Sequence, residues 1–438
     1  MDITPLEKWT SSKLRTAGPL TISLLQRYQL GRLRETLKQV LSHSRFYREH
    51  LRGVDPASVQ NMEDVARLPF TQPIELAARS DDFLCVSPRD VSRIVTLHTS
   101  GTTGGPKRIA FTPEDQELTI DFFHHGMTTL IKPSARVIIF LPGETEGSVG
   151  DLLKKGLSRF GCEGIVFGPI DDYGCALKAI FDLRPSCAVG IPSQLLALSR
   201  YAKSGASHRQ IQIESVLLST DYVPQAVVDS LTRSWGCKVF GHYGMTEMGL
   251  GGAVECFARD GYHMRDADLL FEIINPVTGG PVANGEYGEV VFSTLTRQGM
   301  PLIRYRTGDR SRFLTQPCPC GSVLRRMERI SGRLSASVRL PDGLFISIMQ
   351  LDEIVFCDPR VLSYKAEICL KDGCDCLVLT IHSAQAAVDP ERMASELCRS
   401  LSIGDLIAQK RLKLEVREGE VGYFTTGTTK RFIADRRP

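Results

Sequence analysis

The amino-acid sequence predicts an α/β protein. A large N-terminal domain, with parallel sheets flanked by helices plus an antiparallel β subdomain, precedes a small α/β C-terminal domain. Short apolar runs alternate with helical stretches between about residues 90 and 245, which is typical of parallel strands joined by right-handed crossovers. After about residue 250 the chain is rich in turns, which indicates antiparallel hairpins. We expect the N-terminal domain to span 1–334 and the C-terminal domain 335–438.

The first domain begins with a helical stripe and continues as alternating strands and helices. Apolar residues recur at helical spacing between 28 and 52, which predicts a helix docked on the main body. The predicted buried strands are Arg136–Leu141, Gly164–Phe167, Cys187–Ile191, Ser215–Leu218 and Lys238–Phe240. The predicted helices between them are Val149–Phe160, Cys175–Leu183, Gln194–Ala202 and Gln225–Trp235. Ligands of such folds bind beyond the carboxyl ends of the strands.

Shorter patterns define the remaining elements. Gly285–Phe292 and Pro301–Arg306 predict strands of the antiparallel region. Strands at Tyr364–Leu370, Leu377–His382 and Arg411–Val416, with a helix at Glu391–Leu401, are predicted for the C-terminal domain.

Composition limits the classes of protein to consider. The 438 residues are 42% hydrophobic with a net charge of +3, as expected of a globular chain without the basic face that nucleic-acid binding requires. No apolar run approaches the ~20 residues of a membrane span, and the first residues lack the pattern of a signal peptide, so we expect a cytoplasmic protein. Its thirteen cysteines are then thiols or metal ligands rather than disulfides.

One short loop carries the strongest local signal. Hydroxyls and glycines crowd Thr99–Gly105, and Pro106 and Lys107 follow directly. Glycine backbone, hydroxyls and an ammonium group together can cradle a polyanion such as the phosphates of ATP. The loop is not a Walker A loop, because Arg108 stands where that motif has its magnesium-binding hydroxyl. An ordinary flexible surface turn is the alternative.

Four further clusters follow the loop in order along the chain. Each has a plain alternative when taken alone, such as a strand–turn for the first or a hairpin tip for the second. The clusters are Tyr243-Gly244-Met245-Thr246-Glu247, Arg304-Tyr305-Arg306-Thr307-Gly308-Asp309, Ser331-Gly332-Arg333 and Gly427-Thr428-Thr429-Lys430-Arg431.

Together the five clusters resemble those of the adenylate-forming superfamily, which includes acyl-CoA synthetases. Tyr47 within Arg45–Arg48, the run Leu68–Thr71 and the compact length are similar to the phenylacetate–CoA ligase branch. The resemblance implies that an organic, aromatic or otherwise compact acid reacts with Mg-ATP to give acyl-AMP, and that coenzyme A then takes the acyl group. It also implies a mobile C-terminal lid domain and a possible homodimer. Two alternatives remain: delivery to a carrier-protein thiol, amine or hydroxyl, and a nucleotide-binding protein without turnover.

The resemblance implies a role for each candidate site residue. Lys430 would bridge the substrate carboxylate and the α-phosphate, Thr246 would donate to either group, and Glu247 would hold Mg²⁺. The remaining positions would bind the nucleotide: phosphates on the loop, adenine on the tyrosine, ribose on the aspartate and arginine. These are Thr99, Ser100, Gly101, Thr102, Thr103, Gly104, Lys107, Tyr243, Asp309 and Arg333. A turn carboxylate is the alternative for Asp309, and an exposed tail lysine for Lys430.

The chain departs from the family pattern at two places. Ser335 occupies the position of an acidic or lysine hinge residue, on which the domain rotation depends. Residues 141–146, which help to form the acyl pocket in relatives, carry Glu144 and Glu146, unlike a standard phenylacetate ligase.

Cys256, His263, Cys318 and Cys320 form a candidate zinc site. Thiolate and imidazole ligands, with a Cys-x-Cys pair inside Pro317–Gly321, suit a tetrahedral ion, and members of the phenylacetate–CoA ligase branch carry a similar set. Four protein ligands leave no open position, so the ion would be structural. Unrelated buried thiols beside a core histidine are the alternative. We interpret the cluster of Cys369, Cys374 and Cys376 as incidental.

Overall fold

The computed structural model describes residues 2–16, 18–97, 105–204, 210–333, 337–383, 388–419 and 431–437. The predicted site residues Thr99, Ser100, Gly101, Thr102, Thr103, Gly104 and Lys430, and the hinge position Ser335, lie outside these ranges. The chain divides into two compact units. The first comprises residues 1–132, 145–161 and 241–330, and the second comprises 133–144, 162–240 and 331–438. The predicted division at 334/335 stays a prediction.

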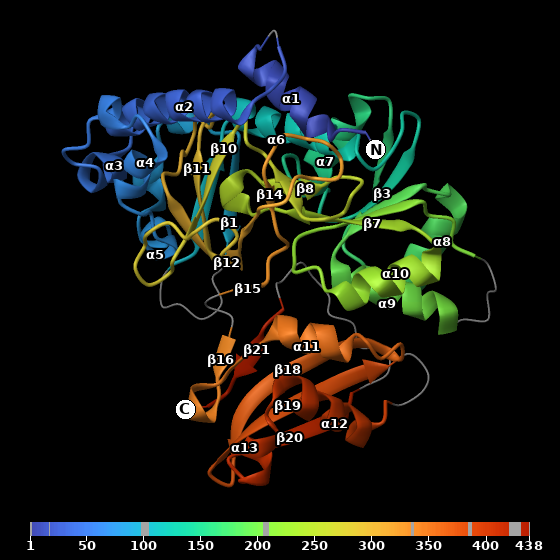
Figure 1. The fold of residues 1–438 in the computed structure, drawn as a ribbon. Helices are drawn as coiled ribbons and strands as arrows, with labels where there is room; N and C mark the ends of the chain where they lie inside the picture. Colours follow the sequence, from blue (N-terminus) through green and yellow to red (C-terminus); the bar gives the residue numbers. More distant parts are fainter. Residues whose placement is uncertain are drawn as a thin grey trace. The chain divides into compact units, whose positions relative to one another are not determined.

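Helices cover the sheets of the first unit, and the long α2 lies across one side of it (Figure 1). The side chain of Thr21 accepts a hydrogen bond from the amide of Leu24 at the start of α2, which caps the helix. The helices are α1 (Pro5–Leu14), α2 (Ile22–His43), α3 (Arg45–His50), α4 (Met62–Arg67), α5 (Pro73–Ala78), α6 (Pro113–Met127) and α7 (Val149–Ser158), and the short 3₁₀ helices are η1 (Pro56–Ser58), η2 (Ser80–Phe83), η3 (Pro88–Asp90) and η4 (Thr246–Met248).

The strands of the first unit are antiparallel. β10, β11 and β12 pair in that order, and β8, β9, β14 and β13 continue from the end of β7. Their bounds are β1 (Arg93–Leu97), β2 (Lys107–Phe111), β8 (Ala253–Glu255), β9 (Tyr262–Met264), β10 (Leu269–Ile274), β11 (Gly288–Thr294), β12 (Tyr305–Ser311), β13 (Phe313–Leu314) and β14 (Arg326–Met327).

One predicted strand is displaced. The sequence places it at Pro301–Arg306, whereas β12 begins at Tyr305 and runs through the Thr-Gly-Asp motif. Arg304 has φ of 44°, a left-handed conformation that a β-strand does not accommodate. The strand therefore begins after this residue.

The second unit holds the parallel sheet, in the order β4, β3, β5, β6 and residues 238–240 of β7. The apolar runs predicted as buried strands all form these strands, which confirms the predicted fold class. The elements are β3 (Arg136–Phe140), β4 (Glu163–Val166), β5 (Cys187–Gly190), β6 (Ser215–Leu218), β7 (Lys238–Tyr243), α8 (Tyr173–Leu183), α9 (Pro192–Ser204) and α10 (Gln225–Trp235).

Residues 331–437 complete the second unit with a four-stranded sheet in the order β20, β19, β18, β21. β21 runs parallel to β18, and Ala366 lies opposite Ile433. The elements are β15 (Gly332–Arg333), β16 (Ser337–Arg339), η5 (Pro341–Gly343), β17 (Phe345–Ser347), α11 (Ile348–Val355), β18 (Val361–Lys371), β19 (Cys374–Ser383), α12 (Pro390–Leu401), α13 (Gly404–Ala408), β20 (Leu412–Glu418) and β21 (Ile433–Asp435).

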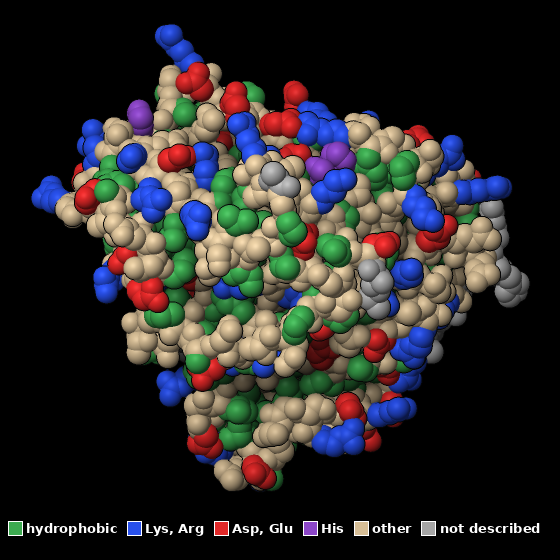
Figure 2. Space-filling view, turned by 45° about the horizontal axis from the view of Figure 1, so that its top comes forward, with side chains coloured by type: hydrophobic (Ala, Val, Ile, Leu, Met, Phe, Trp, Pro, Cys, Tyr) green, Lys and Arg blue, Asp and Glu red, His purple; other side chains and the backbone are tan. Residues whose placement is uncertain are grey.

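The charged side chains follow the near-neutral composition. Figure 2 shows basic and acidic side chains interspersed on the visible face. Within the described part of the chain, none of the helices has the length and apolar character needed to cross a bilayer.

Candidate active site

A β-hairpin fixes both ends of the hydroxyl-rich loop. Leu97, the last residue of β1, lies opposite Lys107, the first residue of β2. Most of the intervening loop is outside the described residues, so its predicted contacts with phosphate stay predictions. Lys107 is described, and it is largely buried.

Lys107, Glu247 and Tyr305 form a buried polar cluster. The ammonium group of Lys107 donates to Glu247 Oε1 and also lies 3.3 Å from the hydroxyl of Tyr305. That hydroxyl donates to the same carboxylate oxygen at 3.1 Å. Glu247 is only 2% exposed, and a carboxylate removed from water to this degree requires a cationic partner. The structure thus brings the last residue of the loop motif into contact with the predicted magnesium ligand.

Arg297 holds the backbone of Glu247. Its guanidinium donates to the carbonyl oxygen of Glu247 at 2.6 Å and lies 4.5 Å from the centre of the Phe111 ring. Burial lowers the pKa of Arg297 to about 10, because water no longer solvates the charge. The sequence analysis missed this residue, since a lone arginine between two strands belongs to none of the motifs.

The turn that presents Thr246 and Glu247 requires a glycine. A Cβ at Gly244 would lie 2.1 Å from the carbonyl oxygen of Leu250, a distance that no side chain tolerates. The amide of Leu250 donates to the carbonyl of Met245, which closes the turn. Thr246 begins η4 and is partly exposed.

Tyr243 and Asp309 meet at a second position. The Tyr243 hydroxyl donates to Asp309 Oδ2 at 3.0 Å, and the amide of Asp309 donates to the hydroxyl of Thr307 at 3.0 Å. The Tyr243 ring stacks on Tyr262, with centroids 6.3 Å apart and planes at 26°. Tyr243 and Asp309, the residues predicted to bind adenine and ribose, are therefore neighbours. Tyr262 holds the tyrosine ring in place, and Thr307 holds the aspartate.

Arg304, the first residue of the Arg304–Asp309 motif, has a structural role. Arg304 forms a two-pronged ion pair with Glu272, at 2.9 and 3.1 Å, and donates to the carbonyl oxygens of Ala66 and Leu68 at 2.7 and 2.6 Å. Buried arginines that satisfy carboxylate and carbonyl groups together are strong anchors. This residue attaches the N-terminal helices to β12.

Tyr47 and Thr71, two positions that are similar to the phenylacetate–CoA ligase branch, contact one another beside the segment that leads into β12. Their hydroxyls lie 2.9 Å apart, and the Tyr47 hydroxyl accepts from the amide of Ile303 at 2.9 Å. The sequence analysis predicts no role for these two positions. The contacts show that they fix the segment leading into β12.

Arg333 lies in β15 of the second unit and is partly buried. Lys430 is outside the described residues. The predicted roles of both residues, and of the loop, stay predictions.

The four predicted zinc ligands converge in the first unit. Their ligand atoms all lie within 4.8 Å of one another, with Cys256 Sγ 3.6 Å from Cys318 Sγ and Cys320 Sγ 3.5 Å from His263 Nε2. A tetrahedral zinc ion with sulfur ligands at about 2.3 Å sets sulfur–sulfur edges of about 3.8 Å. None of the cysteines is in a disulfide. The donor set fits zinc in both chemistry and spacing.

Burial and hydrogen bonding have opposite effects on the pKa values of these thiols. Burial raises the pKa of Cys256 to about 12. Burial also opposes ionisation of Cys320, but hydrogen bonds led by that with His263 lower its pKa to about 6.

Close contacts fix the backbone around the four predicted zinc ligands. Gly261, with φ of 79°, precedes β9, and a Cβ there would lie 2.8 Å from the carbonyl oxygen of Met327. Glu7 of α1 accepts from the hydroxyl of Ser322 at 2.6 Å and from the amide of Val323 at 2.8 Å. The first helix thus fixes the segment that follows Cys320.

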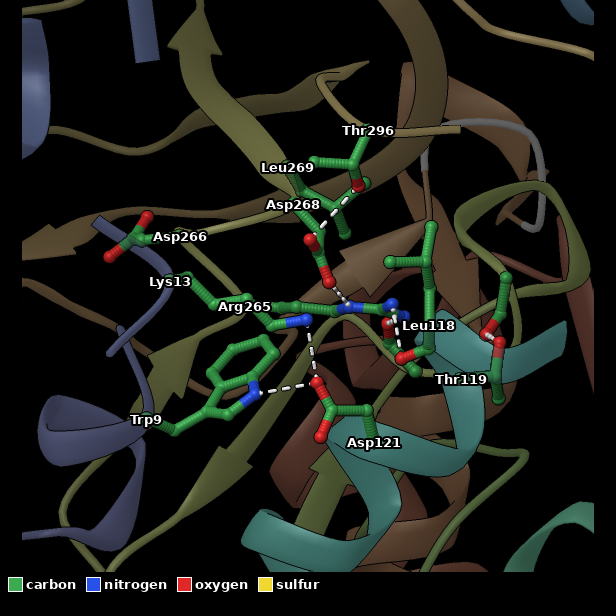
Figure 3. A network of polar contacts seen from close by, with 12 residues as sticks. Trp9, Lys13, Leu118, Thr119, Asp121, Arg265, Asp266, Asp268, Leu269 and Thr296 are labelled. Carbon is green, nitrogen blue, oxygen red and sulfur yellow. Dashed lines mark hydrogen bonds and ion pairs between the residues drawn. The ribbon is translucent and has the colours of Figure 1, made fainter. Parts of the chain in front are cut away.

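A second group of possible metal ligands, Asp121, His124 and His125 on α6, has a different use. The carboxylate of Asp121 accepts from Trp9 Nε1 at 2.9 Å and pairs with the ammonium of Lys13 at 2.6 Å (Figure 3). These contacts attach α1 to α6.

Comparison with known proteins shows which fold this chain has and which family it belongs to. The fold is that of adenylate-forming CoA ligases: a solved 2-hydroxyisobutyryl-CoA ligase, in complex with its acyl-AMP, superposes with a TM-score of 0.82 at 19% identity and covers 95% of this chain and 90% of that one. The chain belongs to the AMP-binding enzyme family, whose model matches residues 30–296.

Two curated relatives of this chain are phenylacetate-coenzyme A ligases. A phenylacetate-coenzyme A ligase of Thermus thermophilus is 29% identical over 80% of this chain and 79% of the relative. The enzyme of the same name from Escherichia coli is 28% identical over 86% of this chain and 87% of its own. These matches confirm the resemblance inferred from the motifs.

Proposed function

We propose that the protein is an AMP-forming acid–CoA ligase. The observation that carries the proposal is the buried contact between Lys107 and Glu247, at the end of a hydroxyl-rich loop in a chain of the AMP-binding family. An ammonium group for polyphosphate and a carboxylate for a divalent cation are thereby in one place.

The reaction begins with attack of the substrate carboxylate oxygen on the α-phosphorus of ATP. The bond to the bridging oxygen breaks and pyrophosphate leaves. The two reactants are both anions and repel one another in a cleft of low dielectric constant. The loop residues and Lys107 hold the β- and γ-phosphates, and Lys430 bridges the carboxylate and the α-phosphate as charge develops there. The thiolate of coenzyme A then attacks the acyl carbon, and AMP leaves with the bonding electrons.

Glu247 is the residue that would hold Mg²⁺, which prefers carboxylate oxygen. The site fits this role because the carboxylate is fixed by Lys107, Tyr305 and its own backbone. When bound, the ion neutralises charge on the phosphates. Thr246 donates to the α-phosphate or to the substrate.

The nucleoside is held at Tyr243 and Asp309. The tyrosine ring offers a flat face to adenine, and the carboxylate accepts from the ribose hydroxyls because it has two acceptor oxygens and no donor. Arg333 contacts the same sugar or the phosphates.

Residues 335–438 act as the lid that carries Lys430. In this proposal the lid presents Lys430 for adenylation and then rotates away so that coenzyme A can react.

A structural zinc ion completes the first unit. Cys256, His263, Cys318 and Cys320 would hold it and connect the chain after Glu247 to the segment after Asp309. The matching interatomic spacings support this assignment.

The substrate is an organic acid, aromatic or otherwise compact, by similarity to the relatives named above. The test incubates the protein with ATP, Mg²⁺ and phenylacetate, benzoate or 2-hydroxyisobutyrate, and measures pyrophosphate and acyl-CoA. We expect acid-dependent pyrophosphate release and acyl-CoA formation. Release that never needs coenzyme A would favour another acceptor, and ATP binding without pyrophosphate–ATP exchange would show a protein without turnover.

A further inference from the structure

Helix α10 begins without a capping side chain of its own. Its N-cap residue is Pro224, which makes no side-chain hydrogen bond, although the first amides of a helix have no acceptor within the helix. Glu353 of α11 supplies the acceptor: its Oε1 accepts from the amide of Gln225 at 2.9 Å, and its Oε2 accepts from that of Ala226 at 3.2 Å. The hydroxyl of Tyr222 also donates to Oε1, at 2.6 Å. A residue 128 positions after Gln225 therefore caps α10.

The end of α11 is capped by a side chain from the opposite direction. Arg200 of α9 donates to the carbonyl oxygen of Phe356, the C-cap residue of α11, at 2.5 Å, and also to that of Val361 at the start of β18. Carbonyl oxygens at a helix C-terminus carry partial negative charge, and amides at an N-terminus carry partial positive charge. The guanidinium at the end of α11 and the carboxylate at the start of α10 are therefore both favourably placed.

We call these hydrogen bonds of Glu353 and Arg200 the clamp. They lie within the second unit, and they join its helices α9 and α10 to α11 and β18. Helix α10 packs against both α9 and α11 (Figure 1). One buried apolar cluster contains Leu231 of α10 and Val355 of α11. The two stretches of chain thus share a core as well as the clamp.

The burial of Arg200 opposes this contact. Arg200 is 7% exposed. Among the described residues it forms no ion pair, and the carboxylate of Asp358, whose charge acts on it, pairs with Arg360 at 2.6 Å. Burial lowers the pKa of Arg200 to about 10, because water no longer solvates the guanidinium. A buried charge that only carbonyl oxygens satisfy is unfavourable, and separation of the two stretches would return it to water. Apolar burial favours the contact and this charge opposes it, which suits a contact that opens and closes.

We propose that Glu353 and Arg200 are positioning residues: the clamp holds the lid against α9 and α10 in one of the two orientations that the reaction uses, and it opens when the lid rotates. This inference rests on the proposed function, in which the lid rotates between the half-reactions. Loss of the clamp shifts the lid toward the other orientation, because an equilibrium moves away from the state that loses contacts. The half-reaction that needs the clamped orientation then slows relative to the other.

Asp389 supplies a matched control. Its Oδ1 accepts from the amides of Glu391 and Arg392 at 3.0 and 3.2 Å, which caps α12. Like Glu353, it is a carboxylate at a helix N-terminus, but it lies only two and three positions from its donors. Asp389→Ala should therefore weaken a helix of the lid without removing any contact of the clamp.

The experiment separates the two half-reactions in the full-length protein. Acid-dependent pyrophosphate–ATP exchange reports adenylation, and acyl-CoA formation from synthetic phenylacetyl-AMP or benzoyl-AMP reports thioester transfer. We expect Glu353→Ala and Arg200→Met to change the ratio of the two rates about 10-fold, in the same direction, as the loss of a hydrogen bond to a charged group does. Glu353→Gln keeps an acceptor oxygen and should recover part of the change. Asp389→Ala should leave the ratio within about 3-fold of wild type, because its effect is independent of the clamp.

A ratio that stays the same in both clamp variants, or that shifts in opposite directions in the two, overturns the inference. Equal loss of both half-reactions overturns it as well, because a purely structural contact gives that result. If the wild-type protein exchanges with no acid tested and transfers from neither adenylate, the proposed function fails. The next measurement then decides whether the clamp exists.

Hydrogen exchange tests the clamp without activity. In Arg200→Met the acceptor of the first amides of α10 is intact, so these amides are exposed only if the whole contact opens. The amides of Gln225 and Ala226 should exchange at least about 10-fold faster in Arg200→Met than in wild type or Asp389→Ala. Rates are compared with those of the β5 amides, which report global unfolding. Unchanged exchange in Arg200→Met would mean that Glu353 caps α10 independently of Arg200, which overturns the inference.

Discussion

The ammonium of Lys107 donates a hydrogen bond to the carboxylate of Glu247, although 140 positions separate the two residues in the chain. One residue ends the loop motif and the other ends the Tyr-Gly-x-Thr-Glu motif. Their contact is a relationship that neither motif reveals alone. The Lys107 ammonium neutralises the charge of Glu247, the predicted magnesium ligand, inside the first unit.

Removing one partner of this pair should destabilise the protein more than removing both. In Glu247→Gln the Lys107 ammonium stays buried without its counter-charge, so the free energy of unfolding should fall by about 3 kcal/mol. The double variant Lys107→Met/Glu247→Gln should recover more than half of that loss. Urea denaturation of the wild type, Lys107→Met, Glu247→Gln and the double variant measures the coupling, and additive losses would contradict a buried ion pair.

Removing the Tyr243 hydroxyl should separate packing from hydrogen bonding. Tyr243→Phe keeps the ring against Tyr262 but loses the bond to Asp309, so we expect the KM for ATP to rise roughly 3- to 10-fold, equivalent to about one hydrogen bond. Asp309→Asn should raise it further, because an amide presents one acceptor in place of two. Steady-state kinetics with varied ATP checks both, with thermal melting as the control for folding. An unchanged KM in Asp309→Asn would remove Asp309 from the ribose site.

The fold class could be predicted from the sequence because strand–helix alternation depends on local apolar patterns. Arg136–Leu141 and Lys238–Phe240 were found in this way, and β3 and β7 contain nearly all of their residues. The start of β12 could not, because it depends on the conformation of Arg304, and that in turn depends on Glu272 and the carbonyl oxygens of a distant helix. Such contacts leave no periodic signal.

The candidate site could be predicted only through the family resemblance. The resemblance of their motifs to the adenylate-forming superfamily assigns roles to Glu247 and Asp309, and these roles stay predictions. Arg297 acts through a contact with the backbone carbonyl oxygen of Glu247. Nothing in its sequence neighbours distinguishes it from an ordinary surface arginine.

Metal analysis should find one zinc ion for each chain. Cys318→Ser should lose it, because a hydroxyl is a poor replacement for a thiolate ligand, and the melting temperature should fall. Cys369→Ser is the matched control, since this cysteine lies in β18 outside the cluster and should retain the metal. Elemental analysis of the purified proteins decides between these outcomes. Metal-free wild-type protein that melts normally, and does not change on adding zinc, would refute the assignment.

His242 should make the protein less stable in acid. It lies 6.3 and 6.1 Å from the rings of Phe122 and Phe123, measured between centroids, and burial lowers its pKa from 6.5 to about 4. The unfolded chain therefore binds a proton near pH 6.5 that the folded protein does not accept until about pH 4. By linkage, stability is complete above pH 6.5 and is lost as the pH falls toward 4.

This loss should amount to about 2–3 kcal/mol between pH 7.5 and 4.5, from the size of the shift. His242→Gln cannot titrate in this range, so its free energy of unfolding should fall less over the same interval by that amount, even if it is less stable at pH 7.5. Urea denaturation at pH 7.5, 6.0 and 4.5 compares the two slopes directly. Since other ionisable groups are common to both proteins, their contributions cancel in the difference. Parallel stability curves would mean that His242 is protonated as readily in the folded protein as in the unfolded chain.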